Sequence, residues 1–453
     1  MTTKHNRPLA AIILAAGQGT RMKSVLHKVL HPIAGKPMLH HLLDSVAALG
    51  AERTVVVVGA GGEQVEASVA GRDVSIAWQR EQLGTGHAVA QAKDALGGFA
   101  GDVLILYGDV PLVSAATLQR MVDRLNFGIE PRCVVLGFRP DDAGAYGRIL
   151  AGNDGAIVKM VEYKDADEAE RAAPLCNSGL MAARASDLFV LLDSIGNDNA
   201  AGEYYLPDIV MLPGQSSAVI EVEDASEVAG VNSRAELAGL EGVWQAKRRT
   251  AAMADGVTLI APETVWFSHD TAIARDVTVE PNVWFGPGVS IASGATIHAF
   301  SHIEGASIGA HCEVGPFARL RPGTVLEEKA KIGNFVETKK AHLGKGAKAN
   351  HLSYIGDAYV GAGANIGAGT ITCNYDGYFK YQTVIGEGAF IGSNTALVAP
   401  VTIGAGAIVG AGSTITADVE PDALALVRPP QQAKLGWAAR FRAVMGAKKA
   451  AGK

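Results

Sequence analysis

The chain lacks paired cysteines, long apolar runs and an excess of positive charge, and each absence excludes a class of protein. Its 453 residues include four cysteines, far apart and without CxxC spacing, so we expect reduced thiols, as in the cytosol, and no disulfide framework. No apolar run approaches the roughly 20 residues that span a bilayer, which predicts a cytoplasmic protein without a membrane partner. The net charge of −6 argues against nucleic acid as a partner, because domains that bind it are usually basic.

The first half of the sequence alternates apolar runs with helical periods. Continuous apolar segments at 9–17, 53–61, 102–111 and 133–138 end at glycine, aspartate or proline, or in an aromatic residue, and amphipathic stretches at 38–50 and 84–96 lie between them. Strands that are apolar throughout are typical of a parallel sheet covered by helices on both faces. We therefore predict an α/β, Rossmann-like domain with a mainly parallel sheet, whose ligands bind beyond the carboxyl ends of the strands.

The second half has a six-residue period instead. From about Gly256 glycine becomes dense, and apolar residues recur six apart from Ile308 to Ile332 and again from Ile385 to Ile415. A fixed period sustained this long indicates a solenoid. Six residues suit one short strand and a corner, so we predict a parallel β-helix with three units per coil. The stretch 233–255 reads as a linking helix, with Ser233 as N-cap and Gly256 as its end, and 430–453 as a basic amphipathic tail.

The turn after the first strand, "AAGQGTRMKSVLHKVLH", raises the question of a phosphate ligand. It lacks the third glycine of the dinucleotide fingerprint and the Gly-Lys-Ser/Thr of a P-loop. Its glycines allow backbone N–H groups to approach phosphate oxygens, and Arg21 and Lys28 supply positive charge. A plain tight turn is the alternative.

This segment, "LAAGQGTRMKS…KVLH", resembles the N-terminal signature of sugar-1-phosphate nucleotidyltransferases. Nearly the whole chain is similar to the bacterial family of bifunctional N-acetylglucosamine-1-phosphate uridyltransferases/glucosamine-1-phosphate N-acetyltransferases. One departure is His27, which stands where that family usually has proline. The resemblance implies a uridyltransferase domain at 1–232, a helical linker at 233–255, a left-handed β-helix acetyltransferase domain at 256–429 and a tail at 430–453.

For the first domain, the resemblance implies UTP and N-acetylglucosamine-1-phosphate as substrates. Arg21 and Lys28 then act on the triphosphate, and Mg²⁺ is held by Asp109 and Asn232. A carboxylate that ends a buried strand needs a partner in any case, and a metal ion is a natural one. The implied substrate-binding residues are Leu14, Ala15, Gly17, Lys28, Gln79, Gly84, Thr85, Tyr107, Gly147, Glu162, Asn177 and Asn232.

In the second domain the repeats are interrupted between Leu343 and Asn374, and extra polar and aromatic residues follow Thr372. Repeat proteins place such insertions on a binding face. Here the resemblance implies His351 as general base, and we expect Glu337 to help set the charge and tautomer of its ring. It implies glucosamine-1-phosphate at Arg321, Lys339, Tyr354 and Asn365, and acetyl-coenzyme A at Ala368, Asn374, Tyr375, Ser393, Ala411 and Arg428, with Asn374 at the reaction centre.

The leading hypothesis is therefore a homotrimeric enzyme that acetylates glucosamine-1-phosphate and couples the product to UTP, forming UDP-N-acetylglucosamine. One alternative is a single nucleotidyltransferase whose β-helix only assembles or regulates. Another is a purely structural trimerising module, which leaves the N-terminal set of residues unexplained.

Overall fold

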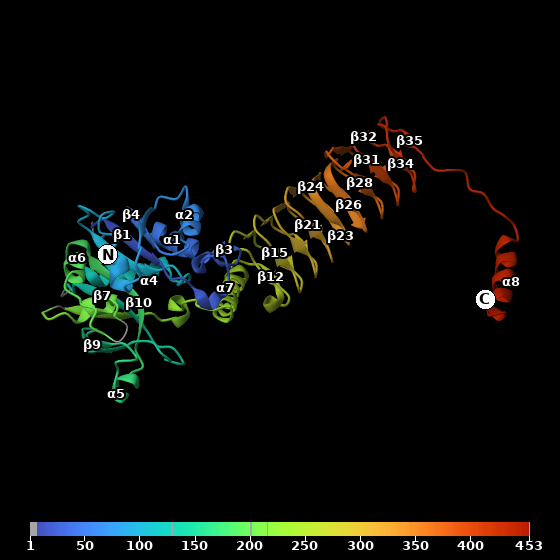
Figure 1. Cartoon of the computed structure of the whole chain (residues 1–453). Helices are drawn as coiled ribbons and strands as arrows, with labels where there is room; N and C mark the ends of the chain where they lie inside the picture. Colours follow the sequence, from blue (N-terminus) through green and yellow to red (C-terminus); the bar gives the residue numbers. More distant parts are fainter. Residues whose placement is uncertain (1–6, 128–129, 200–201, 215, 453) are drawn as a thin grey trace. The chain divides into compact units, whose positions relative to one another are not determined.

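The computed structural model describes residues 7–127, 130–199, 202–214 and 216–452, which form two compact units, Met1–Arg248 and Arg249–Lys453 (Figure 1). The four domain boundaries predicted from the sequence are not tested by this division into two units, so they stay a prediction. In this part of the chain, no helix has the length and apolar character needed to cross a membrane.

A mainly parallel sheet forms the centre of the first unit. In sheet order its strands are β11 (Ser217–Glu221), β7 (Cys133–Phe138), β10 (Cys176–Arg184), β6 (Asp102–Tyr107), β1 (Leu9–Ala15), β4 (Arg53–Val58) and β5 (Ser75–Trp78). β10 runs antiparallel to both its neighbours, whereas the other adjacent pairs are parallel. The short strands β8 (Arg148–Ala151) and β9 (Ile157–Val161) pair beside β10, and β2 (Pro32–Ile33) pairs with β3 (Lys36–Pro37).

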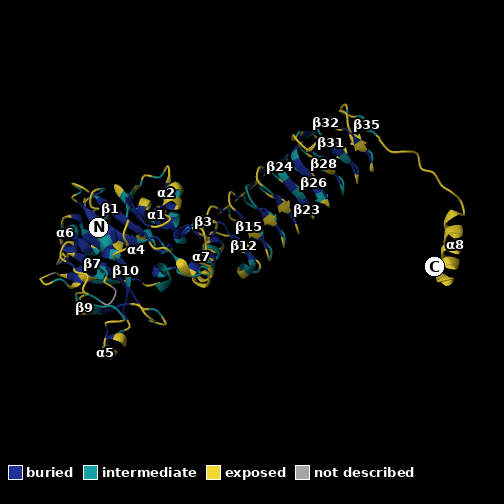
Figure 2. Cartoon of the chain, viewed as in Figure 1, coloured by how far each residue is buried: buried dark blue, intermediate teal, exposed yellow. Residues whose placement is uncertain are grey.

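Helices cover both faces of this sheet, as the apolar strands predicted. Ala11 and Ile13 of β1 pack with α1 (Met38–Ala48), α2 (Gly62–Val69) and α4 (Ala115–Leu125). The alternate residues Ile12 and Leu14 pack on the other side with α3 (Thr85–Ala90) and α6 (Ala185–Leu192). The buried centre of the strands is visible in Figure 2. The remaining short helix of this unit, α5 (Glu168–Arg171), carries a capping box. The helix predicted at 84–96 is shorter than expected, since α3 ends at Ala90 and turns follow.

The predicted linking helix is α7 (Arg234–Ala254). The Ser233 hydroxyl accepts a hydrogen bond from the Glu236 N–H at 3.3 Å, and the Glu236 carboxylate accepts one from the Ser233 N–H at 2.9 Å. This reciprocal pair is a capping box. Gly256 follows the helix with a φ of +92°, a backbone conformation that favours glycine.

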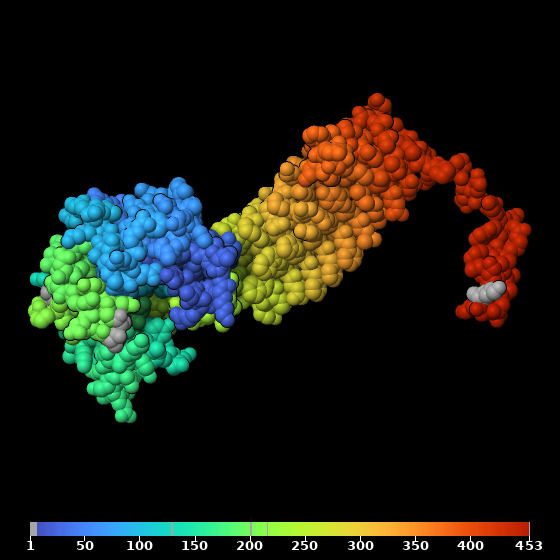
Figure 3. Space-filling model, in the orientation of Figure 1, coloured from blue at the N-terminus to red at the C-terminus, as the bar shows by residue number. Residues whose placement is uncertain are grey.

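The second unit is a left-handed parallel β-helix with three faces, whose coils follow one another in sequence order in Figure 3. The first face consists of β12 (Thr258–Leu259), β14 (Thr278–Val279), β17 (Thr296–Ile297), β20 (Glu313–Val314), β23 (Lys331–Asn334), β25 (Lys348–His351), β27 (Asn365–Ile366), β30 (Phe390–Ile391), β33 (Ile408–Val409) and β35 (Leu424–Ala425). The second consists of β13 (Ala272–Ile273), β16 (Ser290–Ile291), β19 (Ala306–Ile308), β22 (Thr324–Leu326), β24 (Glu337–Leu343), β26 (Tyr354–Val360), β29 (Thr383–Ile385) and β32 (Val401–Ile403). The third consists of β15 (Trp284–Phe285), β18 (His302–Ile303), β21 (Arg319–Leu320), β28 (Ile371–Cys373), β31 (Ala396–Val398) and β34 (Thr414–Ile415), together with the first residues of β24 and β26.

The hexapeptide residues point into the coils, as predicted. Val314 pairs with Ile332 in the next coil, three hexapeptides further along. The two runs with the six-residue period are buried throughout, at 0–3% exposure. After the last coil, the tail forms α8 (Trp437–Ala450), in which no residue is buried.

Candidate active sites

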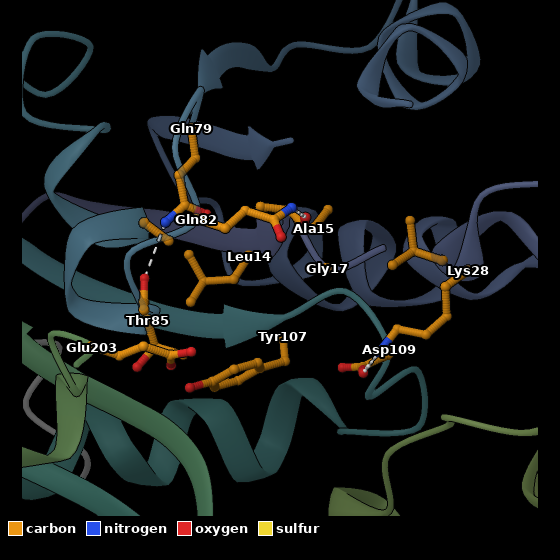
Figure 4. A pocket seen from close by; sticks show the side chains of 14 residues that line it. Leu14, Ala15, Gly17, Lys28, Gln79, Gln82, Thr85, Tyr107, Asp109 and Glu203 are labelled. Atoms are coloured by element: carbon orange, nitrogen blue, oxygen red, sulfur yellow. Dashed lines mark hydrogen bonds and ion pairs between the residues drawn. The ribbon is translucent and has the colours of Figure 1, made fainter. Parts of the chain in front are cut away.

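A cavity of about 330 Å³ lies where β1, β5 and β6 end at their carboxyl termini, the edge of the sheet that the strand pattern predicted. Figure 4 shows side chains from these elements facing it. The lining residues predicted from the sequence are Leu14, Ala15, Gly17, Lys28, Gln79, Gly84, Thr85, Tyr107 and Asp109. Gly84 has a φ of +107°, and a Cβ there would lie 2.6 Å from the Tyr204 carbonyl oxygen, so this turn requires glycine.

Lys28 and Asp109 line this cavity, and Asn232, which is not among the lining residues, lies beside Lys28. The Lys28 ammonium forms an ion pair with the Asp109 carboxylate and lies 3.3 Å from the Asn232 amide oxygen. Both charged side chains are largely buried, at 12% and 17% exposure. Asn232 is fixed from α7, because the Glu236 carboxylate accepts its backbone N–H at 2.5 Å. Residues from three distant parts of the sequence thus bring two hard oxygen atoms around one cation.

A second cavity, of about 690 Å³, adjoins the first and shares Thr85, Tyr107 and Glu203 with it. Its lining includes the predicted residues Gly147, Glu162 and Asn177. Burial raises the pKa of Glu162, and the carboxylates of Asp208 and Asp165 raise it further. A cleft that offers several polar side chains beside apolar surface suits a ligand with hydroxyl groups to hydrogen-bond.

Two sequence expectations for this unit need comment. Arg21 is exposed in the short helix Thr20–Met22 and lines neither cavity.

His27 is buried at 6% exposure, and within the described residues neither ring nitrogen has a hydrogen-bond partner. Its backbone N–H donates to the Gln64 side-chain oxygen at 2.9 Å, and the Gln64 amide donates to the Val25 carbonyl at 2.9 Å. Gln64 therefore holds the loop that carries Lys28.

Sequence reasoning missed Gln82 and Glu203 at this site. The Gln82 amide donates to the Ala16 carbonyl at 3.0 Å, which ties the loop after β5 to the glycine turn. Glu203 lines both cavities. Gln82 lies within "QREQLGTGHA" and Glu203 within "GEYYLPD", so both segments could be predicted to lie near the site. Neither segment has a period that indicates which of its side chains faces the ligand.

His351, on the β-helix, is exposed at the end of β25. Its Nδ1 lies 2.7 Å from the Asn334 side-chain oxygen, one coil earlier on the same face. The expectation that Glu337 sets the state of this ring is wrong, because the Glu337 carboxylate accepts a hydrogen bond from the Arg321 guanidinium at 2.8 Å. An amide oxygen at Nδ1 requires a proton there, which leaves Nε2 of a neutral ring as the proton acceptor.

Three cations lie together on the same unit as this histidine. The pKa of Lys339 is lowered by the neighbouring Lys380 ammonium and by Arg321. Lys380 belongs to the inserted loop, where Tyr375 and Lys380 pair as an antiparallel bridge, and sequence reasoning missed it. Glu337 pairs with Arg321 and Asp357 acts on Lys339, but the three cations outnumber these two carboxylates. The remaining positive charge is suited to bind a phosphate. The Asn374 amide donates to the Asp357 carboxylate at 2.5 Å, which fixes the start of the loop.

The residues expected at acetyl-coenzyme A lie on consecutive turns of the coils. The Ala368 carbonyl accepts the Asn394 N–H at 2.7 Å and the Ser393 carbonyl accepts the Gly412 N–H at 2.8 Å. The Arg428 guanidinium donates to the Ala411 carbonyl at 2.7 Å. These positions therefore form a continuous column of small residues that ends in an exposed arginine. Tyr354 and Asn365, expected at the sugar, are half-buried on β26 and β27.

The fold and these sites define a nucleotidyltransferase domain joined to a hexapeptide-repeat transferase domain. Residues 11–155 match the family model of the MobA-like NTP transferase domain, and residues 382–417 match that of the bacterial transferase hexapeptide with six repeats.

Full-length relatives narrow this class to one family. The bifunctional protein GlmU of Rhizorhabdus wittichii is 69% identical over 451 residues, which cover 99% of this chain and 100% of that protein. The GlmU of Sphingopyxis alaskensis is 66% identical over 449 residues, 98% of this chain and 99% of that protein. The chain belongs to the GlmU family of bifunctional enzymes. HddC from Yersinia pseudotuberculosis, solved in complex with GMP-PN, covers 52% of this chain and 99% of its own, with 18% identity and a TM-score of 0.40.

Proposed function

We propose that the second unit transfers the acetyl group of acetyl-coenzyme A to glucosamine-1-phosphate, and that the first unit couples the resulting N-acetylglucosamine-1-phosphate to UTP. The observation that carries the uridyl step is the pair of adjoining cavities that share Thr85, Tyr107 and Glu203. A nucleotide in the first and a sugar in the second bring their phosphates together beside Lys28 and Asp109, which supports a transfer between them.

In uridyl transfer, a phosphate oxygen of the sugar attacks the α-phosphorus of UTP. The bond from the α-phosphorus to the bridging oxygen breaks, and pyrophosphate leaves with its electron pair. Lys28 stabilises the charge that develops on the phosphoryl oxygens. Arg21 is assigned to the outgoing phosphates, for which its exposed place beside the glycine turn is suitable. No covalent intermediate on the enzyme is needed.

The residues present also fit Mg²⁺. In the structure the Lys28 ammonium occupies the space between the Asp109 carboxylate and the Asn232 amide oxygen, so this pair of oxygens already accommodates a cation. Two protein oxygens completed by phosphate and water are typical of Mg²⁺ sites. Bound there, the ion neutralises phosphate charge.

In acetyl transfer, the sugar amine attacks the thioester carbonyl, and the sulfur of coenzyme A leaves as thiolate. His351 accepts the amine proton at Nε2, since Asn334 engages Nδ1. Arg321, Lys339 and Lys380 hold the sugar phosphate, with Tyr354 and Asn365 at the sugar. Ala368, Ser393, Ala411 and Arg428 line the coenzyme, and Asn374 and Tyr375 border the reacting carbonyl.

We further assign the enzyme to the cytoplasm and to a homotrimer formed through the β-helix. Exposed, stacked rings support an interface on this unit: Phe317 lies between Phe300 and Phe335, with ring centroids 4.8 and 5.2 Å apart. The division into 1–232, 233–255, 256–429 and 430–453 is retained as the proposed domain organisation.

The test is incubation with glucosamine-1-phosphate, acetyl-coenzyme A, UTP and Mg²⁺, with both products resolved. We expect free coenzyme A, pyrophosphate and UDP-N-acetylglucosamine. Pyrophosphate release only when the sugar is supplied already acetylated would favour the alternative, a nucleotidyltransferase whose β-helix has no acetyl-transfer activity.

A further inference from the structure

The amide of Gln79 is held in one orientation at the inner wall of the first cavity. Gln79 is 5% exposed. Its Nε2 lies 3.0 Å from the Gly84 carbonyl oxygen and 3.1 Å from Nδ1 of His87. A carbonyl oxygen only accepts, so the amide presents its NH₂ group to Gly84. Its second proton then points at the His87 ring.

This geometry sets the state of His87, which lies on α3. Nδ1 must present its lone pair to the Gln79 NH₂ group, so the proton of the neutral ring sits on Nε2. The Gln91 amide nitrogen lies 3.2 Å from this Nε2, but it donates to the His87 carbonyl oxygen at 3.0 Å. Gln91 therefore takes no proton from the ring, because an amide nitrogen only donates. The hydrogen-bonded relay consists of Gly84, Gln79 and His87.

The relay leaves Gln79 with a single free polar atom, its oxygen Oε1. In the part of the chain that the structure describes, no protein group donates to this atom. Since both amide protons are used, the side chain offers the cavity an acceptor and no donor. Uracil carries a donor at N3–H, whereas cytosine has an acceptor at the same position. An oxygen acceptor fixed at this place therefore favours uracil, whose N3–H can donate to it. In cytosine, the N3 lone pair would face the lone pair of Oε1.

We propose that His87 is a positioning residue that makes the nucleotide site selective for uracil over cytosine, by holding the Gln79 amide with its oxygen toward the base. The inference rests on the proposed uridyl transfer, and within it assigns base choice to a residue that does not touch the base. Without the His87 acceptor, only Gly84 restrains the amide, and a rotated amide would present NH₂ to the base and accept cytosine.

The test compares kcat/KM for UTP and for CTP in the full chain, with N-acetylglucosamine-1-phosphate as the second substrate. The variants are His87→Ala, which removes the acceptor, and His87→Asn, whose side-chain oxygen replaces Nδ1 as acceptor. The ratio of the two kcat/KM values is the readout, because a general loss of stability or of active enzyme cancels in it.

In His87→Ala we expect the UTP/CTP ratio to fall about tenfold, the effect of losing one restraining hydrogen bond of about 1.4 kcal/mol. In His87→Asn we expect it to stay within about threefold of the wild-type ratio, because the acceptor is retained. An unchanged ratio in His87→Ala would overturn the proposal, since Gly84 alone would then fix the amide. An equal fall in both variants would also overturn it, by pointing to packing. A wild-type chain that does not use UTP would instead refute the proposed function itself.

Discussion

Replacing His27 tests how the structure accommodates the residue that departs from the family pattern. The backbone at His27 has φ −56° and ψ 140°, values that proline adopts without strain. His27→Pro removes a buried imidazole whose two nitrogens have no partner among the described residues. It also removes an N–H whose acceptor, Gln64, is exposed and can turn to water.

The expected change in stability follows from four contributions. A buried polar group left unpaired costs about 1–3 kcal/mol, and the restricted unfolded chain of a compatible proline contributes about 0.4–1 kcal/mol. Against these stand one lost hydrogen bond, about 1 kcal/mol, and the lost packing of the ring. We expect a net stabilisation of about 1 kcal/mol for His27→Pro, and a gain of similar size for His27→Phe, which keeps the ring volume and the N–H.

The assay is chemical denaturation of the full chain, followed by a signal from the first unit, at pH 7.5 and at lower pH. Burial, together with the Lys28 and His31 charges, lowers the pKa of His27. The unfolded chain therefore takes up a proton near pH 6.5 that the folded chain does not, and wild-type stability falls as pH drops below about 6.5. The stability of the His27→Phe protein should fall less steeply as the pH drops. A destabilised His27→Phe, or pH slopes identical to wild type, would refute this reasoning.

Three further substitutions separate the two sites. His351→Ala should lower acetyl transfer about 100-fold or more and leave uridyl transfer unchanged in a pyrophosphate-release assay; loss of both activities would contradict independent sites. Asp109→Asn should lower the Mg²⁺-dependent uridyl transfer about 100-fold with acetyl transfer intact, and an unchanged metal dependence would refute the assignment of Asp109. Lys380→Met should raise the KM for glucosamine-1-phosphate about tenfold, the worth of one hydrogen bond between charged groups, while an unaltered KM would exclude Lys380 from the phosphate site.

The elements were predictable because burial imposes strong periods on the sequence. The apolar run of β1 and the hexapeptide positions from Ile308 to Ile332 are buried on the faces expected. Side-chain partners between coils were not predictable, because they depend on register. Asn334 precedes His351 by 17 residues and lies beside it, whereas Glu337 faces Arg321. Only three residues in the sequence separate Asn334 from Glu337, and the repeat pattern does not specify which of them lies beside His351.

The partners within the first unit were harder to predict for a second reason. Lys28 and Asn232 lie 204 residues apart and meet only because the sheet and α7 bring their loops together. The relay of Gln79 and His87 lies within one short segment, yet its role depends on which atom faces the cavity. That choice follows from the position of the Gly84 carbonyl, which sequence spacing does not reveal.

Mixing two variants tests whether the uridyl and acetyl sites of this enzyme work separately. His351→Ala and Asp109→Asn proteins are each incubated with glucosamine-1-phosphate, acetyl-coenzyme A, UTP and Mg²⁺, then combined. We predict that neither alone forms UDP-N-acetylglucosamine at the wild-type rate and that the mixture does, because acetylated sugar phosphate made by the Asp109→Asn protein reaches the intact uridyl site of the other. Full product formation by His351→Ala alone, or none from the mixture, would be incompatible with two separate sites that use His351 and Asp109.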